Sequence, residues 1–181
     1  MSMYRRLGWH LAGLMGLALA GCAGPVDTQT FIDPSVTTNQ TKYDGFLAYA
    51  AFKDLAVEGR FEKAMCQQLV STGHACTPML TAASPTRPQD AASRQRAMAH
   101  SGAQAALVIE LADPDTTSRQ MLANGCPGYR VSLVDTRTQR VIARMAIDTA
   151  GRSTEALPAK AEAVARATVS ALDRKGLLQP R

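Results

Sequence analysis

Two glutamates of this sequence could in principle form a carboxylate pair for acid–base chemistry. Glu58 and Glu62 are four residues apart, so on a helix they would lie one turn apart on the same side. Such a pair could act as general acid and general base. Arg60 and Lys63 are interleaved with them, a pattern that is more typical of a solvated helix face. We therefore favour the surface interpretation for both glutamates.

The other candidates for catalysis have no evident partner. His74 and His100 fall near expected helix ends without an acid or a nucleophile at a suitable spacing, and we expect both at the surface. Cys126 precedes Pro127-Gly128 and could be a reactive thiol, but we favour a disulfide or an inert loop cysteine. No nucleophile elbow, P-loop or Rossmann glycine pattern occurs. We expect a protein that is not an enzyme and binds no cofactor.

Cys22 has the clearest chemical context of the cysteines. It follows a mostly apolar run from Leu7 to Ala20, which comes after the cationic pair Arg5 and Arg6. This is the outline of a secretory signal, and the run is shorter than the roughly 20 residues that a membrane span needs. The tetrapeptide ending at Cys22 resembles the lipobox of bacterial lipoproteins. The alternative is an ordinary cleaved signal with a chance cysteine.

The lipobox resemblance implies a location. Residues 1–21 would be the signal peptide, and Cys22 would become the acylated N-terminus, carrying fatty acids such as palmitate. Two or more acyl chains hold a protein stably on a membrane. In the lipoprotein pattern an Asp after the cysteine retains the protein in the inner membrane, whereas Ala23 stands there in this chain. We expect a lipid anchor on the periplasmic face of the outer membrane.

The composition narrows the functional classes. Removal of the predicted signal peptide takes away Arg5 and Arg6, so the mature chain would keep 18 of the 20 basic residues against 15 acidic ones. Because the basic residues are scattered, nucleic-acid binding is not expected. The segment 22–43 is rich in Thr, Asp, Pro, Asn and Gln, which predicts a flexible tether. Residues 44–181 then fit a single periplasmic domain.

The remaining cysteines suggest one disulfide. In an oxidising periplasm, three thiols can form one bond and leave one thiol over. We favour Cys66 with Cys76, because a helix ending near Gly73 and a chain that reverses after it would bring the two together. Cys126 could replace either partner. A metal site with His74 is the other alternative, but it lacks a fourth ligand and any paired CxxC spacing.

Hydrophobic periodicity predicts a mixed sheet of about five strands with about three helices. The order is strand, helix, strand, helix, three strands, helix, which gives an α/β (α+β) fold with a parallel strand pair and a hairpin. The predicted strands are 45–53, 75–82, 105–111, 129–133 and 141–147, and the predicted helices are 61–73, 91–101 and 157–175. One side of the hairpin, with Arg130, Ser132, Arg144 and Asp148, is expected to face water. The segment Asp113 to Gly128 is expected to be an exposed loop and a place for contacts.

Three segments resemble a broad group of envelope lipoproteins. They are the helix from Phe61 to Gly73, the junction from Gly102 to Ile109, and the hairpin from Tyr129 to Ala143. The group includes the curli-secretion and Pel polysaccharide-export lipoproteins, activators of peptidoglycan synthases and the N-terminal domain of TolB. The resemblance covers about 43–178, and it implies the fold more than any one activity. No site residue is implied by it.

Two functions fit this sequence. The first is a membrane-anchored, non-catalytic assembly, export or regulatory accessory, which would bind another envelope protein or associate with itself. The second is a module that binds a small ligand or a glycan. The low aromatic content, 5%, disfavours the second, because sugar sites commonly stack rings on aromatic side chains.

Overall fold

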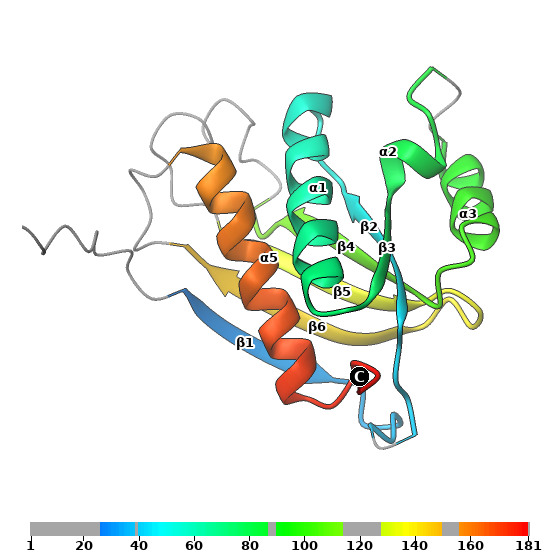
Figure 1. Ribbon diagram of the computed structural model, residues 1–181, viewed down its shortest axis with the longest axis vertical. Helices are drawn as coiled ribbons and strands as arrows, with labels where there is room; N and C mark the ends of the chain where they lie inside the picture. The colour runs from blue at the N-terminus through cyan, green and yellow to red at the C-terminus, as the bar shows by residue number, and fades with distance from the viewer. Residues whose placement is uncertain (1–25, 39, 87–89, 114–127, 150–155, 181) are drawn as a thin grey trace, which may run out of the picture.

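The computed structural model describes residues 26–38, 40–86, 90–113, 128–149 and 156–180 (Figure 1). The predicted signal peptide, Cys22 and Cys126 lie outside these ranges, as does most of the predicted loop from 113 to 128. The expectations for them stay predictions.

The described residues form one six-stranded mixed sheet in the order β1-β6-β5-β4-β2-β3. β2 is parallel to both β3 and β4, and all other neighbours are antiparallel. The predicted mixed sheet, parallel unit and hairpin are therefore confirmed, with one more strand than expected. The strands are β1 (Asp27–Ile32), β2 (Gly45–Ala50), β3 (Ala75–Pro78), β4 (Ala105–Leu111), β5 (Tyr129–Asp135) and β6 (Val141–Asp148).

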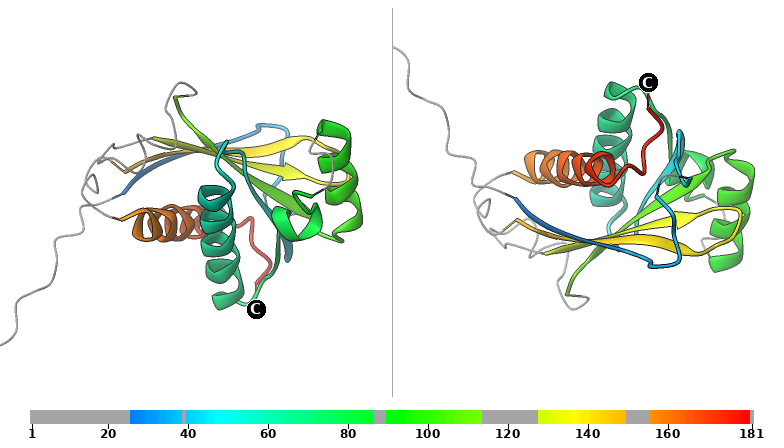
Figure 2. Two further views of the ribbon diagram at one scale, coloured as in Figure 1. Left: turned by 90° about the horizontal axis from the view of Figure 1, so that it is seen from above. Right: turned by 90° about the horizontal axis from the view of Figure 1, so that it is seen from below.

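Two long helices lie side by side on one face of the sheet (Figure 2). α1 (Leu55–Ser71) is capped at its start by Asp54, whose carboxylate accepts hydrogen bonds from the N–H groups of Ala56 and Val57. α5 (Leu157–Arg174) is followed by Gly176 with a φ of 67°, a left-handed conformation that glycine adopts readily. Both helices cover the main core, whose centre includes Phe61, Met65 and Leu133.

Two short helices cover part of the opposite face. α2 (Met79–Ala82) and α3 (Ala91–His100) pack through Met79 and Ala97 against Leu47 of β2, in a second and smaller cluster. Leu47 points away from the main core because successive side chains of a strand face opposite sides. The sheet is thus covered along one face and only at the β2 end of the other.

Three sequence expectations differ from the structure. The predicted tether contains β1, which pairs with β6 from Asp27 to Ile32. The predicted strand 75–82 is divided into β3 and α2 at Pro78, because proline removes a donor from the strand and is well suited to a helix start. The helix predicted from Phe61 begins six residues earlier, at Leu55.

Candidate functional site

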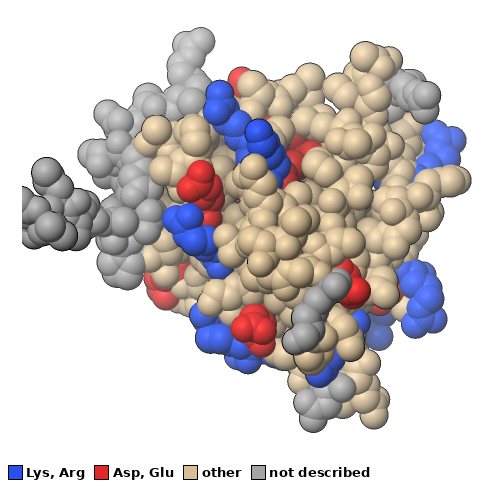
Figure 3. Space-filling view, in the orientation of Figure 1, with Lys and Arg blue, Asp and Glu red and all other residues tan. Residues whose placement is uncertain are grey.

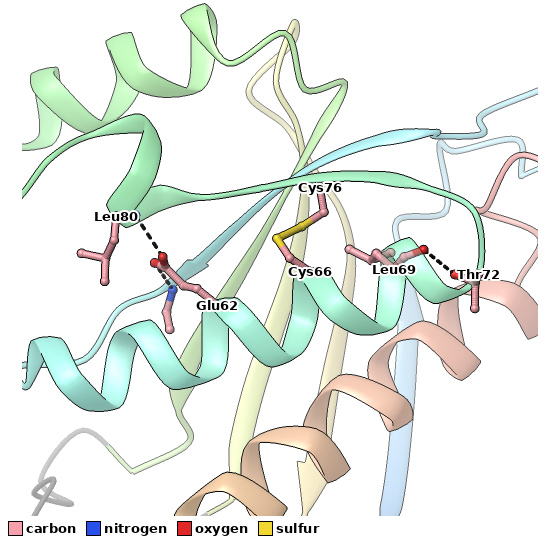
Figure 4. Close-up of a disulfide and its surroundings, with 7 residues drawn as sticks. Glu62, Cys66, Leu69, Thr72, Cys76 and Leu80 are labelled. Carbon is pink, nitrogen blue, oxygen red and sulfur yellow. Dashed lines mark hydrogen bonds between the residues drawn. A yellow bond between two sulfur atoms is a disulfide. The ribbon is translucent and has the colours of Figure 1, made fainter.

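Glu62 is a buried carboxylate on α1. It has no exposed surface, and it accepts hydrogen bonds from the N–H of Ala50 at 3.2 Å and the N–H of Leu80 at 2.9 Å. Figure 4 shows its side chain pointing from α1 toward Leu80, on the same side of the helix as Cys66. The expectation of a solvated helix face is wrong for this residue. The carboxylate joins α1 to the end of β2 and to α2.

Glu58 lies one turn earlier on α1 and is also buried, with 7% of its surface exposed. Its carboxyl shares a hydrogen bond with Glu62 and lies close enough to feel the charge of Arg94 on α3. Burial, the largest cause, and the neighbouring Glu58 together raise the pKa of Glu62 to about 8, although the hydrogen bonds from the main chain of Leu80 and Ala50 lower it. Burial also raises the pKa of Glu58. Near neutral pH, Glu62 therefore keeps its proton and donates it toward the Glu58 carboxylate.

Tyr49 and Arg94 complete this group, which we call the Glu58–Glu62 cluster. The Arg94 guanidinium carbon lies 5.8 Å from the centre of the Tyr49 ring, within the range of a cation–π contact. Burial is the main cause that raises the pKa of the Tyr49 hydroxyl. A positive charge thus faces the Glu58 carboxylate, from a different helix.

The geometry of the cluster does not suit hydrolysis between two carboxyl groups. Glycosidases hold their carboxyl groups roughly 5 to 9.5 Å apart, with the scissile bond between them. Glu58 and Glu62 are both buried and lie within hydrogen-bonding reach of each other, which is closer than that separation. Both oxygens of Glu62 already accept from main-chain N–H groups. This arrangement holds structural elements together.

The structure contains the disulfide that the sequence favoured, between Cys66 of α1 and Cys76 of β3. The Cα atoms of the two cysteines are 5.1 Å apart, and Figure 4 shows the bond one turn beyond Glu62. Helix α1 is therefore fixed to the β2–β3 side of the domain by a covalent bond as well as by the Glu62 hydrogen bonds.

His74 is buried, with 5% of its surface exposed, so the surface expectation is wrong for it. Its Nδ1 lies 3.1 Å from Thr72 Oγ1 and its Nε2 lies 3.1 Å from the Gln179 carbonyl oxygen. Both ring nitrogens thus have protein partners, and they connect the end of α1 to the C-terminal segment. His100 is exposed, as predicted. Within the described ranges no three His, Cys, Asp or Glu side chains gather as a metal site would require.

Tyr129 carries a buried hydroxyl without a hydrogen-bond partner among the described residues. Its ring packs against Phe61, with centroids 5.2 Å apart. Leaving a hydroxyl buried and unpaired costs roughly 1 to 3 kcal/mol. We expect Tyr129→Phe to raise the free energy of unfolding by up to about 1 kcal/mol in urea titrations, since the apolar ring contacts are kept.

Tyr43→Phe is the matched control for that substitution. The Tyr43 hydroxyl donates to Asp135 Oδ2 at 3.2 Å, so its removal should lower the stability by about 0.5 to 1.5 kcal/mol. Equal losses in the two variants would show that the Tyr129 hydroxyl has a partner in solution.

The face of the sheet opposite α1 and α5 is largely open along β1, β5 and β6. Arg130, Arg144 and Asp148 are exposed there, as the alternation predicted, whereas Ser132 is buried. Phe31 of β1 lies beside Arg144 in the strand register and is 64% exposed. On the face that α1 and α5 cover, basic and acidic side chains are scattered among uncharged ones (Figure 3).

No described helix has both the length and the apolar character that a membrane crossing requires. The sequence matches no protein-family model and no curated protein. The fold, by contrast, is similar to solved structures of PelC from Paraburkholderia phytofirmans.

A PelC variant that was solved as a dodecamer superposes with a TM-score of 0.54 at 14% identity, covering 87% of this chain and 100% of the PelC chain. A second PelC dodecamer gives a TM-score of 0.52 at 13% identity over 86% and 100% of the two chains. Identities this low establish a shared fold.

Proposed function

We propose that this chain is a non-catalytic accessory of the bacterial envelope that associates with copies of itself and serves Pel-type exopolysaccharide export. The observation that carries the proposal is the fold, which matches the whole of a PelC chain that forms dodecamers. The sequence adds a lipobox-like tetrapeptide and a resemblance to the export lipoproteins. Together these features favour an assembly role at the outer membrane.

The described residues favour a non-catalytic role. The only buried pair of carboxyl groups that the structure describes is occupied by main-chain donors and by its own shared hydrogen bond. The two described histidines are engaged with neighbouring protein atoms. The chemical groups that an active site would use therefore hold the fold together instead.

The glycan-binding alternative gains no support from the aromatic residues that the structure describes. Tyr43, Phe46, Phe52, Phe61 and Tyr129 form ring contacts with one another or with His74. Such rings belong to the core and its edge, so they are not available to stack on a sugar. The ring of half-buried Tyr49 contacts Arg94 instead. Phe31 is exposed, and its place at the sheet edge suits a protein contact.

The start of β1 bears on the proposed anchor at Cys22. Only residues 23–26 separate Cys22 from Asp27, the first residue of the sheet. An extended chain covers at most about 3.6 Å per residue, so an acylated Cys22 would hold Asp27 within roughly 18 Å of the lipid attachment point. We infer that the domain works directly against the membrane surface.

Native mass spectrometry of the lipoprotein, extracted from membranes in a mild detergent, tests the proposal. We expect an assembly of several chains, and an N-terminal peptide that begins at Cys22 and carries acyl mass. A monomer at every concentration would overturn the self-association. An unmodified Cys22 on a protein recovered without detergent would overturn the anchor.

A further inference from the structure

Strand β1 forms one edge of the sheet and pairs only with β6. Figure 1 shows it as the outermost strand, beyond β6. The N–H of Asp33 donates to the carbonyl of Ile142 at 3.0 Å, which fixes the phase of the hydrogen-bonding pattern. Because hydrogen-bonded residues alternate along an antiparallel strand, Phe31 directs its main-chain groups toward β6. Thr30 then directs its N–H and C=O away from the sheet.

The outward groups of β1 have no hydrogen-bond partner that the structure records among its described residues. The same alternation places Thr28 and Ile32 with Thr30 on the free side. The main-chain N–H and C=O groups of these three alternate residues therefore form a continuous row of donors and acceptors along the free edge. Such a row is a template on which a further strand can pair.

The strand also lacks the features that usually protect an edge. Natural edges carry Pro, Lys, a bulge or a very short strand. β1 extends over six residues with no Pro, Lys or Arg, and its register with β6 is unbroken. The opposite edge differs, since β3 has four residues and ends at Pro78, which has no N–H to offer. Only β1 is therefore suited to add a strand of several residues.

Phe31 adds an apolar side chain to this edge. It is the most exposed of the large hydrophobic residues described, ahead of Val70 at 59% and Leu55 at 53%. It lies on the open face, where no helix covers β1, with Arg144 as its neighbour in the register. Covering this ring would remove apolar surface from water and so favour association, in addition to the main-chain hydrogen bonds.

We propose that the free edge of β1, with Phe31, is a surface on which a second copy of this chain docks by adding a strand. The proposal rests on the self-association proposed above and names the surface that carries it. A second copy is the occupant that the comparisons favour, because PelC of the same fold forms dodecamers. From Thr28 to Ile32 the edge carries no charge, so it sets up no repulsion between identical chains.

Thr30→Pro tests the main-chain part of this surface. Proline removes the outward N–H of residue 30 and fills the space beside it, and the bonds from β1 to β6 are left in place. Thr30→Val is the matched control, since it changes the same side chain and keeps the N–H. Phe31→Glu tests the side-chain part and leaves the main chain intact.

Sedimentation velocity on the four full-length lipoproteins in one detergent compares their assembly. We expect the wild type and Thr30→Val to form the same assembly, and Thr30→Pro and Phe31→Glu to dissociate at protein concentrations at least tenfold higher. Thermal unfolding confirms that each variant is folded. If Thr30→Pro does not fold, Phe31→Glu alone decides.

The outcomes separate the two proposals. A wild type that is monomeric overturns both of them. A wild-type assembly that persists unchanged in folded Thr30→Pro and Phe31→Glu overturns the role of β1, and the proposed self-association then stands with a different surface. Dissociation of Thr30→Val as well would point to the Thr30 side chain and overturn the strand-pairing model.

Discussion

Raising the pH from 6 to 9 is expected to lower the free energy of unfolding of this domain by on the order of 3 kcal/mol. The pKa of Glu62 is about 8 in the folded chain against an ordinary 4.5. Between these values the folded state holds a proton that the unfolded state has released, so stability falls as the pH rises. About two of the pH units between 6 and 9 lie below the pKa of the folded state. Each of these units lowers the free energy of unfolding by about 1.4 kcal/mol.

Urea unfolding at several pH values, on the wild type and on Glu62→Gln, measures this dependence. The variant has no titrating group at this position, so its stability should change far less between pH 6 and 9. Glu162→Gln is the matched control, because Glu162 is an exposed residue of α5 that pairs with Arg166. It should keep the wild-type slope. A wild type as flat as Glu62→Gln would show that Glu62 is ionised throughout.

The carboxyl pair shows how far the sequence could be taken. The apolar positions Phe61, Met65 and Leu69 correctly predicted a helix, because burial of one helix face leaves a clear period in the sequence. Arg60 and Lys63, which are interleaved with Glu58 and Glu62, predicted a solvated helix face for both glutamates. Both basic residues are exposed in the structure, but Glu62 is fully buried.

One signal could have located Glu62. It is four residues before Cys66, and residues at this spacing lie on the same side of a helix. A cysteine expected to bond to Cys76 must face the interior, so Glu62 faces it as well. Its partners could not be predicted, because they are main-chain N–H groups of Ala50 and Leu80, and main-chain donors leave no trace in the residue types.

Strand β1 was missed for a different reason. Its side chains alternate between exposed and half-buried, with none fully buried. The half-buried side chains include those of Thr28 and Thr30. Threonine has a high strand propensity, but Pro34 and several polar residues nearby indicated a tether. The strand forms because β6, more than a hundred residues later in the chain, provides its hydrogen bonds. Long-range pairing of this kind is not encoded in local periodicity.

Removing the disulfide by the double substitution Cys66→Ala and Cys76→Ala is expected to lower the free energy of unfolding by about 3 kcal/mol. The bond closes a short loop of sequence separation 10, which restricts the unfolded chain and fixes α1 to β3. Urea unfolding with and without dithiothreitol separates these effects from packing, since Cys66 is also a buried core residue.

The reductant should destabilise the wild type and leave the double variant unchanged, because only the wild type has this bond to break. Cys126→Ala removes a thiol without touching the bond, so it should respond to the reductant as the wild type does. If the double variant is less stable than the reduced wild type, the difference in their free energies of unfolding measures the packing that is lost around Cys66. If the reductant left the wild type unchanged, the bond would contribute nothing to stability, and the hydrogen bonds of Glu62 would be the main connection between α1 and the chain that follows β3.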